Sequence, residues 1–410
     1  MSETSLFTLP NGLRVAHCFV PDTTQVTFSL LYNVGSRDEC PSRTGLAHLF
    51  EHLMFGGSAH VPDFDYAMEM ASATNNAWTS PDFTNFYCTL PSANLATAFW
   101  AESDRMLAPS IAASLDVQKR VVIEEFKQTC LNRPYGDAGH RLRALLYRVH
   151  PYRWPTIGLT PDHVAQVTLA EAERFFNTHY SPDNAVLSVC GGVERGRVEE
   201  LAGLWFGPIE RRRVAPRAYP QEPPVESPRR EEVRVDVPQT RIYIALPMPG
   251  ESHPDYKVAD LLTDILASGG SSRFYRRLVM GTDVFTQADA SVSGSEEPGY
   301  LLLTAAIRGN GDDDIRRAEE MLWREALAVA SDGVSDAELQ RALCRYESQR
   351  TFAHISPAAL ARELALCTMR GTTVDAVTRA YRRITTADIR RVAATLLRPD
   401  RACTLVYRPR

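Results

Sequence analysis

The sequence predicts an α+β protein built from two α/β sandwich domains. Its length of 410 residues exceeds what one hydrophobic core usually organises, which argues for two domains or three. Residues 211–232 hold five prolines and a dense set of charges. Because almost nothing there can be buried, we expect an interdomain linker. The predicted domains are therefore residues 1–210 and 233–410, each of ordinary domain size.

Both predicted domains mix strand-like and helix-like segments. Alternating apolar residues predict strands at residues 26–31, 186–190, 241–246 and 300–306. Longer stretches with helical spacing of apolar residues lie at 45–55, 94–108, 116–129, 169–178, 255–267 and 314–330. No residue-level repeat is visible between the halves, so we expect them to share architecture at most.

Composition and charge exclude several classes of protein. With 44% hydrophobic and 23% charged residues, the chain is neither disordered nor a disulfide scaffold, and its eight cysteines form no CxxC pair. A formal charge of -5 gives no sign of a nucleic-acid or anionic membrane partner. No apolar run reaches the roughly 18 residues of a membrane span. The first residues lack the pattern of a secretory signal, so we expect a cytoplasmic protein.

The motif that carries chemistry is H-x-x-E-H, formed by His48, Glu51 and His52. On a helix, residues four apart lie one turn apart on the same face, so both imidazoles can reach one metal ion while Glu51 stays beside them. A catalytic zinc site usually takes three protein ligands and leaves a fourth position to water, whose pKa the metal lowers to about 7. Glu51 can then accept the proton of that water.

The alternative is a pair of structural histidines, hydrogen-bonded to neighbours on a helix whose Glu51 faces solvent. The context disfavours it, because His48, Glu51 and His52 are the only polar residues inside an otherwise apolar helix, and three such groups need a joint explanation. The apolar residues of that helix are Leu46, Leu49, Phe50, Leu53 and Met54. Thr44 and Gly45 precede it and fit an N-terminal cap.

A third ligand has to come from elsewhere, and residues 117–128 are the best source. The expected inward face of this helix holds Val117, Val121, Val122 and Phe126. Glu125 falls on that face, whereas Glu124 follows Arg120 by four residues and can pair with it. Glu125 is therefore the better candidate of the two.

These residues resemble the inverzincin metallopeptidases of the pitrilysin, insulin-degrading and mitochondrial-processing-peptidase family, in its short two-domain bacterial type. The resemblance covers nearly the whole chain. Its segments are residues 35–39, 44–58, 76–87, 102–106, 150–158, 179–193 and 269–279.

The resemblance implies a fold and a set of roles. The fold is two similar domains, each with an antiparallel-rich sheet covered by helices, which together form half of a clam-shell chamber. One zinc ion per chain is held by His48, His52 and Glu125, with Glu51 as the general base. Gln118 stands where the family usually has a Glu that supports the ligands, so fine tuning of the site differs here. Asn76 and Ala77 match the edge strand on which the family lays extended substrate.

A second departure from the family concerns the oxyanion. Active members place an Arg and a Tyr seven residues apart in the C-terminal half, and the matching positions here are Val279 and Thr286. Single-chain members are roughly twice as long as this chain. The resemblance therefore implies an oligomer, either a homodimer or a heterodimer whose related subunit supplies the Arg/Tyr pair.

The leading hypothesis is a zinc endopeptidase that cleaves peptides, or unfolded or leader segments, in an enclosed chamber. The alternative is a non-catalytic assembly subunit of the same family that binds polypeptide without cutting it. His60, His150 and His179 are expected to be structural, since the motif already provides the ligands, and Tyr87 is expected to belong to the core rather than to the cleft.

Overall fold

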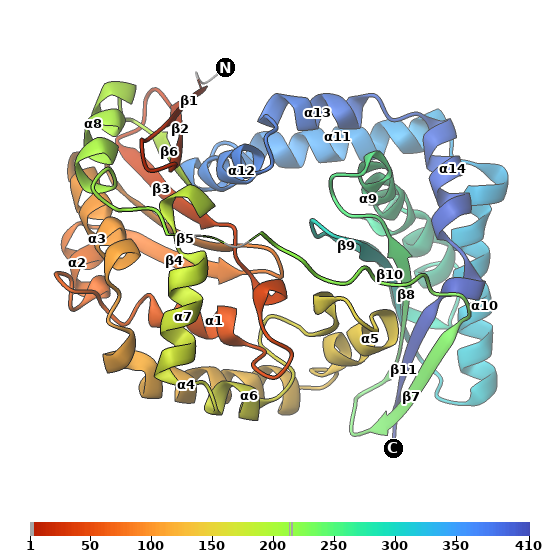
Figure 1. Ribbon diagram of the computed structural model, residues 1–410. Helices are drawn as coiled ribbons and strands as arrows, with labels where there is room; N and C mark the ends of the chain where they lie inside the picture. Colours follow the sequence, from red (N-terminus) through yellow and green to blue (C-terminus); the bar gives the residue numbers. More distant parts are fainter. Residues whose placement is uncertain (1–3, 213, 215) are drawn as a thin grey trace. The chain divides into compact units, whose positions relative to one another are not determined.

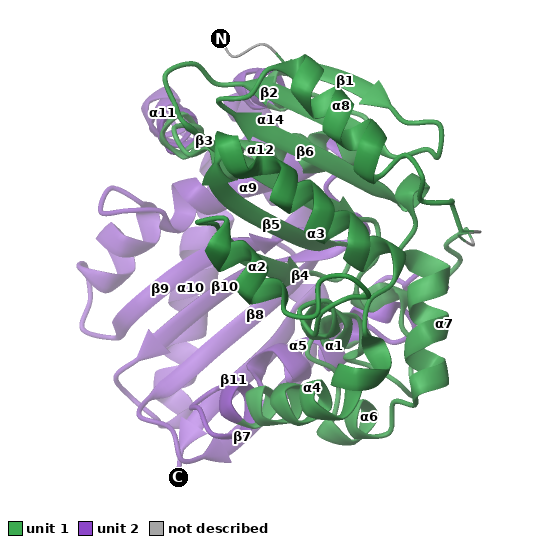
Figure 2. Ribbon diagram, turned by 90° about the vertical axis from the view of Figure 1, so that its left-hand side faces the viewer, with its two compact units in different colours: residues 1–127, 154–219, 350–377 green, residues 128–153, 220–349, 378–410 purple. Residues whose placement is uncertain are grey.

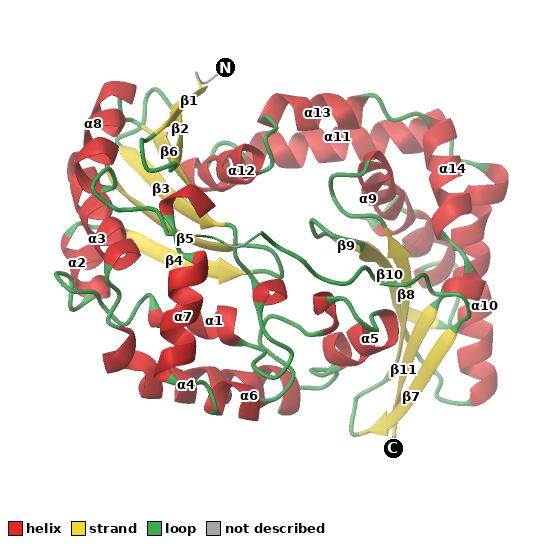
Figure 3. Ribbon diagram, viewed as in Figure 1, coloured by secondary structure: helices red, strands yellow, loops and turns green. Residues whose placement is uncertain are grey.

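A computed structural model describes residues 4–212, 214 and 216–410 (Figure 1). These residues form two β-sheets with helices packed against both, which confirms the predicted mixture of helices and antiparallel-rich sheets (Figure 3). The chain divides into two compact units, residues 1–127, 154–219 and 350–377 in the first and residues 128–153, 220–349 and 378–410 in the second (Figure 2).

The first unit contains a six-stranded sheet with the order β1-β2-β6-β3-β5-β4. Only the β2/β6 pair is parallel. Strand β4 pairs with β5 alone and so forms one edge of the sheet. The strands are β1 (Thr4–Thr8), β2 (Arg14–Phe19), β3 (Gln25–Tyr32), β4 (Thr74–Thr79), β5 (Thr84–Pro91) and β6 (Ala185–Gly191).

Helices cover both faces of the first sheet. One face packs with most helices of the unit into one core, in which Phe28 of β3 meets Phe99 and Phe206. These helices are α1 (Leu46–Leu53), α2 (Phe64–Met70), α3 (Leu95–Leu107), α4 (Ile111–Phe126), α6 (Pro161–Ala165), α7 (Leu169–His179) and α8 (Arg195–Trp205). Helix α12 (Pro357–Met369) lies on the other face, with Leu360 and Leu364 against Cys190. Burial on both faces explains the nearly continuous apolar runs of β3 and β6.

The second unit contains a five-stranded sheet with the order β7-β11-β8-β10-β9, in which only β7 and β11 are parallel. The strands are β7 (Arg229–Val235), β8 (Thr240–Met248), β9 (Phe285–Ser293), β10 (Gly299–Ile307) and β11 (Cys403–Pro409). Its helices are α5 (Ala138–Leu146), α9 (Pro254–Ala267), α10 (Asp312–Asp332), most of α11 (Asp336–Ala353), part of α13 (Val374–Arg382) and α14 (Thr386–Leu396). Helix α9 packs on β9, α14 packs on α9 and α10, and α5 packs on β11.

The two sheets share one topology. The order β2-β6-β3-β5-β4 corresponds strand by strand to β7-β11-β8-β10-β9, with the parallel pair in the same place. Helix α9 lies in the connection from β8 to β9. In the first sheet, the corresponding connection from β3 to β4 contains α1 and α2. The halves therefore share architecture without a visible sequence repeat.

The two compact units are not the two continuous domains that the sequence predicts. Residues 128–153 belong to the second unit and residues 350–377 to the first, so the compact units do not coincide with the continuous ranges 1–210 and 233–410. Each sheet has one face covered by a helix from the opposite part of the sequence, α12 on the first and α5 on the second.

The predicted linker, residues 211–232, extends too far toward the C-terminus. Positions 213 and 215 lie outside the described residues, and the described positions from 211 to 228 form no helix or strand. Residues 229–232 are not linker but the start of β7, whose side chains alternate between half-buried and exposed. Their charges suit an edge strand, which is solvated on one side and pairs through its main chain with β11 on the other.

The predicted helices exist with small shifts of their ends. The largest shift concerns residues 116–129, where α4 begins at Ile111 and gives way after Phe126 to a π-helical turn, Lys127–Leu131. Among the described residues, no helix combines the length and apolar character needed to cross a bilayer.

Candidate metal centre

Helix α1 is held at its N-terminus by a carboxylate from an earlier loop. Gly45 takes a left-handed conformation with φ of 88° and has no side chain to cap the helix. The buried Glu39 carboxylate accepts hydrogen bonds from the main-chain N–H groups of Gly45 at 2.9 Å and Ala47 at 2.8 Å. Gly45 is the N-cap residue, in line with the expected cap at Thr44 and Gly45. The side chain of Thr44 does not cap the helix, because its hydroxyl instead contacts His163 Nδ1 at 2.8 Å and accepts the N–H of Leu159.

The apolar face of α1 fixes the direction of its polar face. Leu49, Phe50 and Leu53 are fully buried, and the ring of Phe50 stacks on Phe176 of α7 at 5.9 Å between centroids. The helix also packs against α4 and against the edge strand β4. Each polar residue of the motif reaches one of these two neighbours, as the contacts of His48, His52 and Glu51 show.

His48, His52 and Glu125 converge on one point. The Nε2 atoms of His48 and His52 lie 3.7 Å and 3.5 Å from Glu125 Oε2, and the two rings are nearly perpendicular with centroids 4.9 Å apart. One ligand atom from each residue lies within 4.8 Å of the others. In the part of the chain that the structure describes, they are the one group of His, Cys, Asp and Glu arranged in this way.

The electrostatics favour a metal over a proton at His48. Burial lowers the pKa of His48 to about 4, with His52 adding to the effect and Glu125 opposing it. The imidazole is therefore neutral at pH 7 and keeps a lone pair for a metal. The interaction with His52 lowers the pKa of Glu125, so this group is a carboxylate. Two imidazoles and a carboxylate from two helices are a ligand set that zinc accepts.

Glu51 lies beside this cluster and is held by β4. Thr79 Oγ1 donates a short hydrogen bond to Glu51 Oε2. Burial raises the pKa of Glu51, while this hydrogen bond works in the opposite direction. A carboxyl with a raised pKa and one oxygen already fixed is suited to accept and return a proton. The sequence patterns did not single out Thr79, although it lies in the segment 76–87 that carries the family resemblance.

Helix α4 presents Glu125 on a different stripe from the one predicted. Val122 and Phe126 are buried as expected, but Val117 and Val121 are exposed, so that part of the prediction is wrong. The observed stripe consists of Ile111, Ser114, Leu115, Val122 and Phe126. The half-buried Gln118 lies seven residues before Glu125 on the same side of the helix, as a supporting residue requires.

Glu124 faces away from the cluster. Its carboxylate is exposed and pairs with Lys127 Nζ at 2.6 Å, rather than with Arg120. The choice of Glu125 over Glu124 agrees with this geometry.

Asn76 and Ala77 lie in β4, on the open edge of the first sheet. The main-chain N–H of Ala77 donates to Asn76 Oδ1 at 2.8 Å. Since Thr79 of the same strand contacts Glu51, this edge lies next to the motif helix that carries His48 and His52. An extended peptide could add to it as a further strand.

The three histidines that we expected to be structural, His60, His150 and His179, lie outside the cluster. Asp104 Oδ1 holds His60 Nδ1 at 2.7 Å, and His150 is buried and accepts the N–H of Tyr152. The ring of His179 packs on Phe175. Tyr87 is half-buried in β5, with the guanidinium of Arg362 over its ring.

Val279 and Thr286 belong to the second unit. Val279 ends a π-helical turn, Tyr275–Val279, and Thr286 lies in β9, where its hydroxyl contacts Gln239 Oε1 at 3.1 Å.

Comparisons with known proteins identify peptidase family M16. A model of the insulinase family, peptidase family M16, matches residues 14–151, and a model described as the peptidase M16 inactive domain matches residues 166–345. Zinc protease PqqE of Helicobacter pylori is 28% identical over 341 residues, 82% of this chain and 76% of that protein. Mitochondrial-processing peptidase subunit beta of Saccharomyces cerevisiae is 24% identical over 82% of this chain and 75% of its own length.

Solved structures show the same fold. The crystal structure of a protease from Helicobacter pylori superposes with a TM-score of 0.91 at 24% identity, covering 100% of both chains. The periplasmic protease PqqL from Escherichia coli matches with a TM-score of 0.80 at 19% identity, covering 99% of this chain and 47% of that one.

Proposed function

Since the chain belongs to the insulinase family of M16 peptidases, we propose that it is a zinc-dependent endopeptidase whose metal is held by His48, His52 and Glu125. The observation that carries the proposal is the convergence of these three side chains within 4.8 Å, with Glu51 beside them. The relatives named zinc proteases support the choice of metal.

In this proposal, the three ligands and Glu51 carry the activation of water and the transfer of its proton. Zinc bound at the three ligands would supply a Lewis acid that polarises a peptide carbonyl and activates water. Glu51 takes the proton of the attacking water and then gives it to the leaving amine.

The substrate side of the proposal rests on β4. Main-chain pairing along Asn76 and Ala77 would bind an extended peptide without reading most of its side chains. We therefore expect peptides and unfolded or leader segments as substrates, with loose sequence specificity.

The experiment that tests this proposal is cleavage of an unstructured peptide by the purified chain, with and without a chelator, beside the variant Glu51→Gln. We expect chelation to abolish cleavage and Glu51→Gln to lower kcat by about 10²–10⁴-fold, because a general base contributes that much. The matched control is Glu124→Gln, which removes an exposed carboxylate from α4 and should leave kcat unchanged. Equal cleavage by Glu51→Gln and the unaltered chain would contradict the proposal.

A second candidate is a non-catalytic subunit that binds polypeptide. It is favoured by the expectation from the family resemblance that Val279 and Thr286 replace the Arg/Tyr pair, and both lie within the region matched by the inactive-domain model. Under this reading, the chain would bind an unstructured peptide but leave it intact, with zinc present and with a related subunit added.

A further inference from the structure

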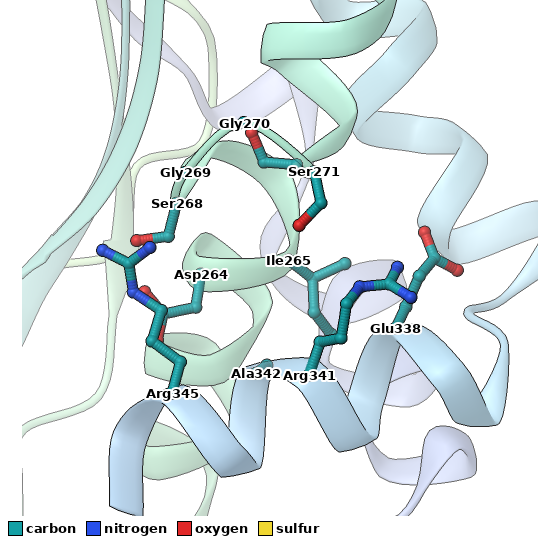
Figure 4. Close-up of a pocket in the computed structure, with 11 residues that line it drawn as sticks. Asp264, Ile265, Ser268, Gly269, Gly270, Ser271, Glu338, Arg341, Ala342 and Arg345 are labelled. Atoms are coloured by element: carbon teal, nitrogen blue, oxygen red, sulfur yellow. The ribbon is translucent and has the colours of Figure 1, made fainter. Parts of the chain in front are cut away.

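The second unit contains a polar pocket that the peptidase proposal does not use. It measures about 330 Å³ and lies between the loop that follows α9 and one face of α11 (Figure 4). The loop reads Ser-Gly-Gly-Ser-Ser over residues 268–272, and the helix contributes Glu338, Arg341, Ala342 and Arg345. The small side chain of Ala342 lies between the two arginines and leaves depth for a ligand.

Two exposed arginine side chains, those of Arg341 and Arg345, line this pocket (Figure 4). Arg341 and Arg345 stand one helical turn apart, and neither makes an ion pair within 4.0 Å with any described residue. Gly269 has a left-handed φ of 81°, and a Cβ there would lie 2.8 Å from Arg345 Nη1. Glycine at this position therefore permits the left-handed backbone conformation and leaves space for the arginine side chain.

Hydroxyl groups add further donors on the loop side. Ser268, Ser271 and Ser272 all line the pocket, and of these the Ser268 side chain already hydrogen-bonds the carboxyl of Asp264. Ser272 is only 4% exposed, and its hydroxyl finds no hydrogen-bond partner among the described residues. Because buried hydroxyls are almost always hydrogen-bonded, this donor lacks an acceptor that a ligand can supply.

The acidic residues of the pocket do not cancel its positive charge. Glu338 is already bound by Arg273, at 2.7 Å and 3.0 Å. Asp264 lies near Arg345, and burial raises the pKa of its carboxyl. Arg341 is therefore left as an uncompensated cation beside the hydroxyl groups.

We propose that this pocket binds a phosphate group, as inorganic phosphate or as the phosphomonoester of a small molecule. A tetrahedral dianion offers several acceptor oxygens, which match guanidinium forks and hydroxyl donors arriving from two sides. The volume holds a phosphate with a small organic group attached.

The pocket loop and the H-x-x-E-H motif hold corresponding places in the two sheets. The loop belongs to the connection between β8 and β9, which corresponds to the connection between β3 and β4 that carries His48, Glu51 and His52. Both connections place a helix against the edge strand of their sheet, α9 on β9 and α1 on β4. The arginines of the pocket come from a later element, α11.

Calorimetric titration of the full-length chain tests the proposal, with inorganic phosphate in one arm and glycerol phosphate in the other, at constant ionic strength. We expect saturable binding with a Kd of about 1 mM or lower. Arg341→Gln should weaken it by at least about tenfold, because a charge-assisted hydrogen bond contributes that much. Ser271→Asp should weaken it similarly by adding a negative charge. Comparable affinity in both arms identifies inorganic phosphate, and tighter binding of glycerol phosphate identifies a phosphomonoester.

The matched control is Arg324→Gln, which removes an exposed arginine of α10 that does not line the pocket. It should bind phosphate as the unaltered chain does. The proposal is overturned if neither ligand gives saturable heat by about 10 mM, or if Arg341→Gln and Ser271→Asp both bind phosphate unchanged. Either result leaves the peptidase proposal untouched, since no cleavage is measured.

Discussion

At the scale of single residues, the metal centre depends on a few side chains that hold others in place. Glu51 is the clearest case, because its position is fixed by the hydroxyl of Thr79 rather than by its own helix. In the proposed mechanism, one carboxylate oxygen of Glu51 accepts the hydrogen bond of Thr79 and the other accepts the proton of water. Thr79 is therefore a positioning residue for the general base.

Thr79→Val should lower kcat about tenfold and leave KM and zinc content unchanged, because a hydrogen bond to a charged group contributes about 1.5 kcal/mol or more. Thr79→Ser keeps the hydroxyl and should retain most of the activity. Steady-state kinetics on one peptide substrate measure both variants. A change confined to KM, or no rescue by serine, would show that Thr79 has another role.

Residue types and their spacing predicted the metal ligands because the chemistry is local. His48, Glu51 and His52 share one turn of helix, and Glu125 follows from the need for a third ligand. Thr79 and Glu39 were not singled out, since each acts across a long stretch of sequence and has no periodic pattern. Val117 and Val121 were wrongly predicted to face inward. Their spacing fits an apolar helix face, but both are exposed, and the buried stripe of α4 begins at Ile111.

At the scale of elements, α1 relies on a distant cap. Glu39→Ala would leave the main-chain N–H groups of Gly45 and Ala47 without their acceptor in a buried place. We expect the free energy of unfolding to fall by about 1–3 kcal/mol. Urea unfolding followed by circular dichroism measures this, with Glu69→Ala on the exposed side of α2 as the control. A loss no larger than that of the control would mean that the cap does not stabilise the helix.

The start of α11 should make stability depend on pH. The ion pair with Arg273, helped by hydrogen bonds from Ser335, lowers the pKa of Glu338 from 4.5 to about 2. A lowered carboxyl pKa stabilises the fold above pH 4.5, and this contribution is lost as the pH falls toward 2.

Compared with Glu338→Gln, the unaltered chain should be more stable by about 1–2 kcal/mol at pH 7, and the difference should shrink between pH 4.5 and pH 2. Unfolding experiments over this pH range measure it, and Glu320→Gln, an exposed carboxylate on α10, should show no such trend. A difference independent of pH would argue against the ion pair as its source.

The alternation of apolar residues predicted interior strands of the two sheets and none of the edge strands. The four predicted strands correspond to β3, β6, β8 and β10, all of them interior. The edge strands β1, β4, β7 and β9 escaped this pattern, because an edge strand carries polar side chains and often charges. The charges of β7 were read as linker for this reason.

At the scale of the whole molecule, the two units are related by topology, and each includes a covering helix from the other half of the sequence. Helix α12 covers the first sheet and α5 the second, so neither half of the sequence is complete by itself. Local patterns along a chain cannot reveal such an exchange, because it depends on contacts between residues hundreds of positions apart.

The assembly expected from the family resemblance stays a prediction. This chain matches 47% of the PqqL chain. We propose that the active form is a dimer, either of this chain or with a related subunit that supplies an Arg/Tyr pair. Light scattering on the chain alone and on material purified from its native host should give about twice the monomer mass in at least one case. A strictly monomeric and active enzyme would contradict this proposal.

The central claim is that His48, His52 and Glu125 form a zinc site, and the most direct test is the zinc content of the purified chain by elemental mass spectrometry. The unaltered chain should hold about one zinc ion per chain, and Glu125→Gln should lose most of it, because three protein ligands are needed to hold a catalytic zinc. The adjacent Glu124→Gln should keep its zinc, since Glu124 pairs with Lys127 instead. Equal zinc content in Glu125→Gln and Glu124→Gln, or none in the unaltered chain after reconstitution, would contradict the claim.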